Sequence, residues 1–234
     1  MFIHTSTLKR CIILLFSGIA VGVSLRVFCF DTISQVFLNR NAYTVVCDAG
    51  HGSPDGGAVA DDGTQEKDIN LAITTKLVES LEGMGIQAVV TREGDSGIYD
   101  ENATTIRQKK VDDMHKRLDI INKSGANLFL SIHMNSFTDT SARGIHIFYA
   151  NENEDTIKLA EEIQRSIVGI TNAKSHDIKH ANTSLYLMKN AKIPSILIEC
   201  GFMSNPQEAQ LLKQEEYQAK IAWAIASAVK KYIN

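Results

Sequence analysis

Residues 43–52 read YTVVCDAGHG, an apolar run that passes directly into a polar, glycine-rich turn. The uncharged run predicts a buried strand over Tyr43–Cys47. A helical pattern follows and is ended by Gly83, with apolar positions every four residues at Ile69, Ile73, Leu77 and Leu81. Strand, turn and helix in this order are typical of an α/β unit, with the polar turn at the carboxyl end of the strand.

The same alternation continues toward the C-terminus. Further strands are predicted at Ile86–Thr91, Asn127–Ile132, Ile145–Tyr149, Leu185–Met188 and Ser195–Ile198. Apolar periodicity predicts helices around residues 111–121, 159–167 and 217–232, and Asn205-Pro206-Gln207-Glu208 is the start signal of a short helix. We therefore expect a three-layer α/β sandwich, with a mostly parallel central sheet and helices on both faces.

The first 30 residues differ from the rest of the chain. Lys9 and Arg10 precede an uncharged apolar run from Cys11 to Leu25, the pattern of a secretory signal or a membrane anchor. Bulky residues follow where signal cleavage needs small ones, which favours an uncleaved anchor. Residues 31–42 are predicted to be a linker and residues 43–234 one domain. Both interpretations place that domain outside the cytoplasmic membrane.

Composition narrows the function classes. The formal net charge of the 234-residue chain is -3, so no broad basic field indicates nucleic-acid binding. Cys47 and Cys200 lie in or beside predicted strands and lack CxxC spacing. Two buried free thiols are expected, and a disulfide between them stays open as the alternative.

Polar residues follow three of the predicted strands. His51 comes shortly after the first, His133 follows Asn127–Ile132, and Glu199 follows Ser195–Ile198. Because sites in parallel α/β sheets form beyond the carboxyl ends of the strands, these side chains should meet at one edge. Glu66 adds a fourth candidate in the first turn of the first helix.

Two imidazoles and one carboxylate form the His₂Glu set of catalytic zinc, which leaves one position for water. Glu66 lies on the same loop-to-helix arm as His51, so His51, Glu66 and His133 are the expected ligands of one zinc ion per chain. Glu199 ends a separate buried strand and is the expected general base and acid.

Three further residues are candidates for supporting this centre. Asp48 lies three residues before His51 and could fix the orientation of that imidazole. Asn135 and Arg92 are candidates for supporting the site or contacting the substrate.

Five segments, in this order, resemble the motifs of the zinc-dependent N-acetylmuramoyl-L-alanine amidases. They are Asp48–Ala58, Glu66–Leu71, Thr91-Arg92 with Asp95, Ser131–Ser136 and Ile198–Asn205. The resemblance covers nearly all of the chain from Val45 onward and implies the same ligands, with Glu199 as the catalytic carboxylate. It also implies hydrolysis of the amide between N-acetylmuramic acid and L-alanine in peptidoglycan. Ala49, Ser53 and Ser136 depart from the usual proline, glycine and alanine. The changes at Ala49 and Ser53 affect the expected loop shape but not the ligands.

The layout of the chain also resembles that of a narrower group of amidases. One anchored domain, with no wall-binding repeat and no inserted helix over the site, is similar to the spore-cortex amidases of spore-forming bacteria. That similarity implies removal of whole peptide stems, formation of muramic-δ-lactam, and a role in sporulation and germination. A site without an inhibitory insert also suggests control by an activating or localising protein partner.

Two other functions stay open on the sequence. A zinc peptidase on a related fold would use the same amide chemistry on a different bond. A wall-binding or partner protein could keep the fold without catalysis, because fold alone does not imply activity. The intact set of His51, Glu66, His133 and Glu199 argues against the second alternative.

Overall fold

The computed structural model describes residues 43–150, 153–181 and 184–234, so the predicted anchor and linker lie outside the described residues. The strands are β1 (Thr44–Ala49), β2 (Gln87–Val90), β3 (Leu128–Asn135), β4 (His146–Ala150), β5 (Lys179–His180) and β6 (Ser195–Phe202). The helices are α2 (Glu66–Gly83), α3 (Ile106–Lys123), α4 (Glu154–Thr171), α5 (Tyr186–Asn190), α6 (Pro206–Leu212) and α7 (Glu215–Ile233). Within the described residues, no helix combines the length and hydropathy of a membrane span.

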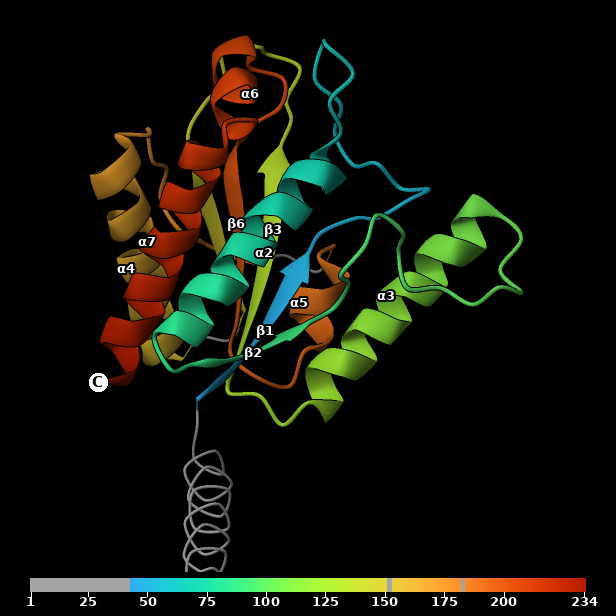
Figure 1. The fold of residues 1–234 in the computed structure, drawn as a ribbon, viewed down its shortest axis with the longest axis horizontal. Helices are drawn as coiled ribbons and strands as arrows, with labels where there is room; N and C mark the ends of the chain where they lie inside the picture. Colours follow the sequence, from blue (N-terminus) through green and yellow to red (C-terminus); the bar gives the residue numbers. More distant parts are fainter. Residues whose placement is uncertain (1–42, 151–152, 182–183) are drawn as a thin grey trace, which may run out of the picture. The chain divides into compact units, whose positions relative to one another are not determined.

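The strands form one mixed sheet in the order β2-β1-β3-β6-β4-β5 (Figure 1). Strands β2, β1, β3 and β6 are parallel, whereas β4 runs antiparallel to β6 and pairs in parallel with β5. The prediction of a mostly parallel sheet is therefore confirmed. The three strands that lead to candidate residues, β1, β3 and β6, are immediate neighbours, so their carboxyl ends meet at one edge.

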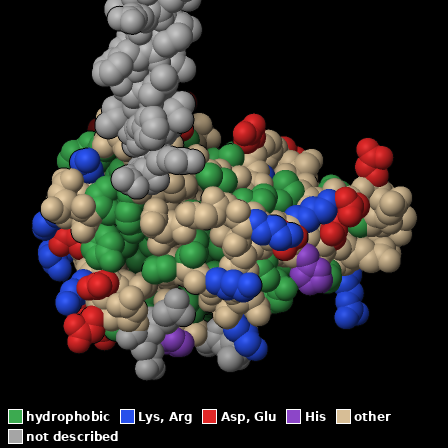
Figure 2. All heavy atoms as spheres, turned by 90° about the horizontal axis from the view of Figure 1, so that it is seen from below, with side chains coloured by type: hydrophobic (Ala, Val, Ile, Leu, Met, Phe, Trp, Pro, Cys, Tyr) green, Lys and Arg blue, Asp and Glu red, His purple; other side chains and the backbone are tan. Residues whose placement is uncertain are grey.

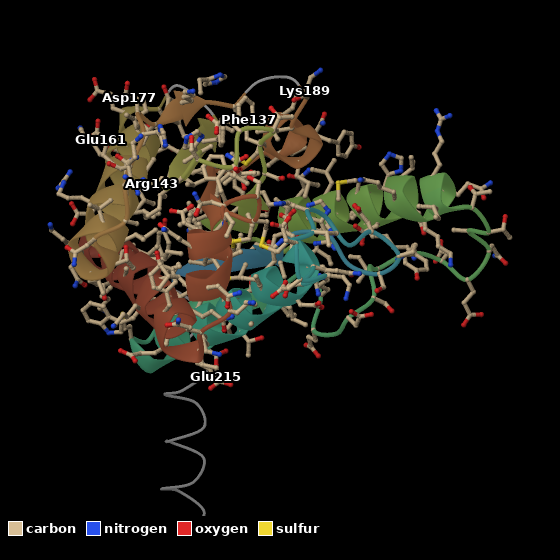
Figure 3. All side chains as sticks on the ribbon, turned by 90° about the horizontal axis from the view of Figure 1, so that it is seen from above. Phe137, Arg143, Glu161, Asp177, Lys189 and Glu215 are labelled. Carbon is tan, nitrogen blue, oxygen red and sulfur yellow. The ribbon has the colours of Figure 1, made fainter. Side chains whose placement is uncertain are left out.

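Helices cover both faces of the sheet, as Figures 1 and 3 show. On one face α2, α4 and α7 bury a large apolar layer that includes Ile73, Ile163 and Ile225. On the other face α3 and α5 cover a smaller layer that includes Phe129 and Met188. Burial of such side chains is the main stabilising contribution to the sandwich. On the described part of the end opposite the candidate site, which Figure 2 shows, acidic and basic side chains are interspersed.

The predicted start of α6 is confirmed in detail. Asn205 Oδ1 accepts hydrogen bonds from the backbone N–H groups of Gln207 and Glu208, both at 3.1 Å. Pro206 occupies the first helical position, where its missing N–H needs no intrahelical partner. This cap places α6 directly behind the end of β6, next to the carboxyl edge of the sheet.

Two predicted elements differ from the structure. The strand predicted at Leu185–Met188 is wrong, because Tyr186–Asn190 forms helix α5. A four-residue apolar run fits one helical turn as well as a strand, and Met188 here faces the core under α3. Strands β3 and β6 also extend past their predicted ends, which places His133 and Glu199 inside strands.

Cys47 and Cys200 are free thiols, both buried, so the prediction of two packed cysteines is confirmed. They lie on β1 and β6, and β3 runs between these two strands.

Candidate metal centre

His51, Glu66 and His133 converge at the carboxyl edge of the sheet, with one potential ligand atom from each within 4.8 Å of the others. Glu66 Oε1 lies 3.2 Å from His51 Nε2 and 3.0 Å from His133 Nδ1. Ligands bound to zinc at about 2.0–2.1 Å in a tetrahedral arrangement lie roughly 3.3 Å apart. The three side chains therefore fit a tetrahedral metal ion with one position left for a further ligand.

His51 is held in an unusual backbone conformation on the turn after β1. Its φ is 62°, in the left-handed region that residues with a Cβ rarely occupy. Its Nδ1 lies 3.0 Å from Asp55 Oδ2, which favours a proton on Nδ1 and leaves Nε2 as the ligand atom. Burial lowers the pKa of His51, but the carboxylates of Asp55 and Glu66 raise it to about 9 overall. The negative charge of these two carboxylates, which favours a proton on His51, also favours a bound metal cation.

Asp55 was not among the residues predicted for the site. The prediction that Asp48 orients His51 is wrong, because Asp55 makes that contact. The signal was present in the sequence, since Asp55 lies four residues after His51 in the same glycine-rich loop, close enough for the loop to turn back on itself.

Glu66 is oriented by backbone groups as well as by the two histidines. The N–H of Met134 donates to Oε1 at 3.0 Å, and the N–H of Ala58 donates to Oε2 at 2.8 Å. Asn70, one helical turn along α2, donates to Oε1 at 3.2 Å. Burial opposes the ionised form, but hydrogen bonds with the two histidines hold the pKa of Glu66 far below its usual range. The ligand therefore remains an oriented anion.

Two glycines leave room for these side chains. A Cβ added at Gly50 would lie 2.3 Å from Cε1 of His133, and one added at Gly57 would lie 2.4 Å from Oε2 of Glu66. Gly57 also has a φ of 69°, which a side chain would disfavour. The absence of side chains at these two glycines is thus a steric requirement of the candidate metal centre.

Glu199 lies beside the triad, because it is the register partner of His133 on the neighbouring strand. Its Oε2 is buried and has no hydrogen-bond partner among the described residues. Burial raises the pKa of Glu199 to about 7, although the nearby imidazole of His133 acts in the opposite direction. A carboxyl group with this pKa can both accept and donate a proton near neutrality, as acid–base catalysis requires.

Asp48 lies beneath the centre in a buried ion pair with Arg117, which is 0% exposed. The nearest approach is 2.6 Å, between Arg117 Nη1 and Asp48 Oδ1. Although burial favours the neutral acid, Arg117 and the hydroxyls of Ser131 and Thr91 lower the pKa of Asp48 to about 2. Arg117 also donates to the backbone oxygen of His51, so the pair fixes the turn that carries this ligand.

Arg117 was not predicted from the sequence. It lies between Met114 and Ile121 on the apolar stripe of α3, and a charged residue on such a stripe is a sign of a buried partner.

Arg92 and Asn135 form hydrogen bonds with backbone groups around the site. Arg92 is buried and donates to the carbonyl oxygens of Ala49, Gly50, Lys67 and Gly94, so it supports the loop and does not face a substrate. Asn135, at the end of β3, accepts a hydrogen bond from the N–H of Ser136 at 2.8 Å.

A cavity of about 480 Å³ opens beside the triad on the α3 and α5 side of the sheet. His51, His133 and Glu199 form part of its lining, and the opposite wall includes Met114, Tyr186 and Leu187. Figure 3 looks onto this end of the sheet, with α3 and α5 along one side and α2 and α7 along the other. Polar side chains on one side of the cavity and mostly apolar ones on the other suit a substrate that has a polar reacting bond.

A mostly parallel α/β sheet with this donor set and an adjacent buried carboxylate suits the chemistry of metal-dependent hydrolases. The chain belongs to the N-acetylmuramoyl-L-alanine amidase family, whose model matches residues 45–231. The family resemblance predicted from the motifs is thus confirmed, and members of the family are hydrolases.

Individual relatives agree with this assignment. The chain is 34% identical to the germination-specific N-acetylmuramoyl-L-alanine amidase of Bacillus subtilis (strain 168), over 81% of this chain and 79% of the relative. Its fold matches the CwlD amidase from Clostridioides difficile, solved in complex with the GerS lipoprotein, with a TM-score of 0.78, 44% identity and coverage of 82% and 98%. An N-acetylmuramoyl-L-alanine amidase from Clostridium difficile 630 matches with a TM-score of 0.72, 34% identity and coverage of 82% and 97%.

Proposed function

We propose that this protein is a zinc-dependent N-acetylmuramoyl-L-alanine amidase, which hydrolyses the amide between N-acetylmuramic acid and the L-alanine of the peptide stem. The observation that supports this most is the convergence of His51, Glu66 and His133 beside Glu199, in a chain of this family. The site predictions made from the sequence name the same four residues.

The residues of the chain have distinct roles in the proposed reaction. Zinc bound by His51, Glu66 and His133 would supply Lewis acidity toward the amide carbonyl and lower the pKa of water. Ionised Glu199 accepts a proton from the attacking water, and protonated Glu199 donates one to the leaving alanine nitrogen. Asp55 keeps His51 in its ligand orientation through the bond to Nδ1.

We further propose a role in the spore cortex, where complete removal of stems leads to muramic-δ-lactam. The similarity to a germination-specific amidase and to the CwlD amidase supports this role. Action outside the cytoplasmic membrane, with residues 1–30 as a tether, follows from the same proposal. The relative solved with a lipoprotein supports the expectation of an activating or localising protein partner.

The test is metal analysis and peptidoglycan digestion with the full-length chain, purified in detergent. We expect about one zinc per chain and release of intact stems with N-terminal alanine. Shorter peptides would indicate a zinc peptidase. Wall binding without release of any peptide, by protein loaded with zinc, would indicate a binding protein. Muramic-δ-lactam that persists in spores lacking the gene would contradict the cortex role alone.

A further inference from the structure

Lys110, on α3, lines the same cavity as the metal centre. Arg117 is the other lysine or arginine of the lining, but it is fully buried. Its guanidinium donates to Asp48, to Asp113 and to two backbone oxygens. The Lys110 side chain, in contrast, is 54% exposed. Of the Lys and Arg side chains that line the cavity, Lys110 is therefore the one with a charge available to a ligand.

The Lys110 ammonium is anchored next to the metal ligands. Its Nζ lies 2.8 Å from Asp55 Oδ2, the same oxygen that lies 3.0 Å from His51 Nδ1. Asp55 takes one of the three N–H donors of the ammonium. A half-exposed side chain leaves the remaining donors accessible from the cavity. Lys110 is thus a fixed cationic donor, separated from the ligand atom of His51 by one carboxylate and one imidazole ring.

The path from the Lys110 ammonium through Asp55 to the ligand atom of His51 is about as long as one or two residues of extended peptide, at about 3.5 Å per residue. An amide carbonyl placed at the triad would bring the next one or two residues of its peptide within reach of Lys110. The apolar wall of Met114 and Leu187 lies along the same cavity and suits a small methyl side chain such as that of alanine.

We infer that Lys110 forms a carboxylate-binding subsite, which selects a stem peptide with a free carboxylate on the residue after the alanine. This inference rests on the proposed amidase function and adds a substrate preference to it. An ammonium–carboxylate contact in a half-exposed site is strong enough to discriminate by about three- to tenfold.

The test uses two synthetic substrates, the γ-methylamides of N-acetylmuramoyl-L-alanyl-D-glutamate and of N-acetylmuramoyl-L-alanyl-D-isoglutamine. Because the γ-carboxyl group is blocked in both, only the first has a free carboxylate on the residue after the alanine. The full-length wild type should have a three- to tenfold higher kcat/KM for the acid than for the amide. In Lys110→Gln the ratio should fall toward one, mainly through a higher KM for the acid, because the lost contact binds substrate and transition state equally.

Lys109→Gln is the matched control. Lys109 is the neighbouring lysine on α3, stacks over the Tyr99 ring at 4.8 Å and is not part of the cavity lining. Lys109→Gln should leave the ratio of the two kcat/KM values unchanged.

Equal kcat/KM for both substrates in the wild type would overturn the subsite alone. A parallel loss on both substrates in Lys110→Gln, with reduced zinc content, would also overturn it and assign Lys110 to the support of Asp55. Failure of the zinc-loaded wild type to cleave either substrate would overturn the amidase function and the subsite together.

Discussion

His133 and Glu199 are register partners on adjacent parallel strands, so the imidazole of a candidate metal ligand and a buried carboxylate project from neighbouring positions of one sheet edge. Backbone pairing between β3 and β6 fixes this relationship, and no flexible loop is needed to bring the two groups together. The metal site and the proton carrier can therefore be separated by substitution.

Glu199→Gln tests this separation directly. The amide has nearly the same shape as the carboxyl group but cannot take up the proton of water, so activity should fall by at least ~10²-fold. Zinc content should stay at about one per chain, because Glu199 is not one of the three converging ligands. Amide hydrolysis would be followed with peptidoglycan, and metal by mass spectrometry. Unchanged activity in this variant would rule out Glu199 as the acid and base.

Asp55→Asn should weaken metal binding without unfolding the domain. The variant loses the anionic acceptor at His51 Nδ1, and loss of such a partner typically reduces metal affinity by about 10- to 100-fold. Competition with a chelator would measure the affinity. Asp61→Asn, an exposed residue in a nearby turn, should behave like the wild type. Equal affinities in the two variants would mean that Asp55 does not orient the ligand.

Gly50→Ala should displace the His133 ring, because the new Cβ would lie 2.3 Å from Cε1. We expect loss of bound zinc and at least tenfold lower activity, with circular dichroism unchanged. Gly169→Ala, inside α4 with nothing within 4 Å, is the control and should raise helix stability by up to ~1 kcal/mol. Normal zinc content in Gly50→Ala would show that the loop can move away from the ring.

The Asp48–Arg117 pair should make stability depend on acid pH. The pKa of Asp48 is about 2 in the folded protein, below its ordinary value of about 3.9. Its ionised form therefore adds on the order of 2 kcal/mol to stability above pH ~4, and this contribution is lost as pH falls toward 2. Urea unfolding between pH 6 and 3 would show a steeper loss in the wild type than in Asp48→Asn. An equal loss of unfolding free energy with falling pH in both proteins would contradict this role of the Asp48–Arg117 pair.

Much of this centre was predictable, because the apolar strands and the polar residues that follow them are visible in the sequence. The prediction placed His51, His133 and Glu199 at one edge on the reasoning that buried parallel strands end together, and the structure brings them together there. The role of Glu66 followed from its place on the helix after the His51 loop. Metal occupancy and catalysis by these residues remain predictions.

The missed features have only weak signals in the local sequence. The acceptor for His51 is Asp55 and not Asp48, since the glycine-rich loop turns back on itself between positions 52 and 55. Helix α5 was predicted as a strand, because four apolar residues cover little more than one helical turn and fit a short buried strand equally well. The two-residue strand β5 is polar and exposed, so it has no hydrophobic pattern to detect.

Among the described strands, β6 comes last in the sequence, yet it lies inside the sheet between β3 and β4. During synthesis, His51, Glu66 and His133 leave the ribosome well before Glu199 does. A nascent or truncated chain that ends before residue 195 thus has a donor set for metal but no proton carrier, and β3 lacks its neighbour. In the proposed mechanism, hydrolysis therefore becomes possible only after β6 has been made, later than all three expected metal ligands.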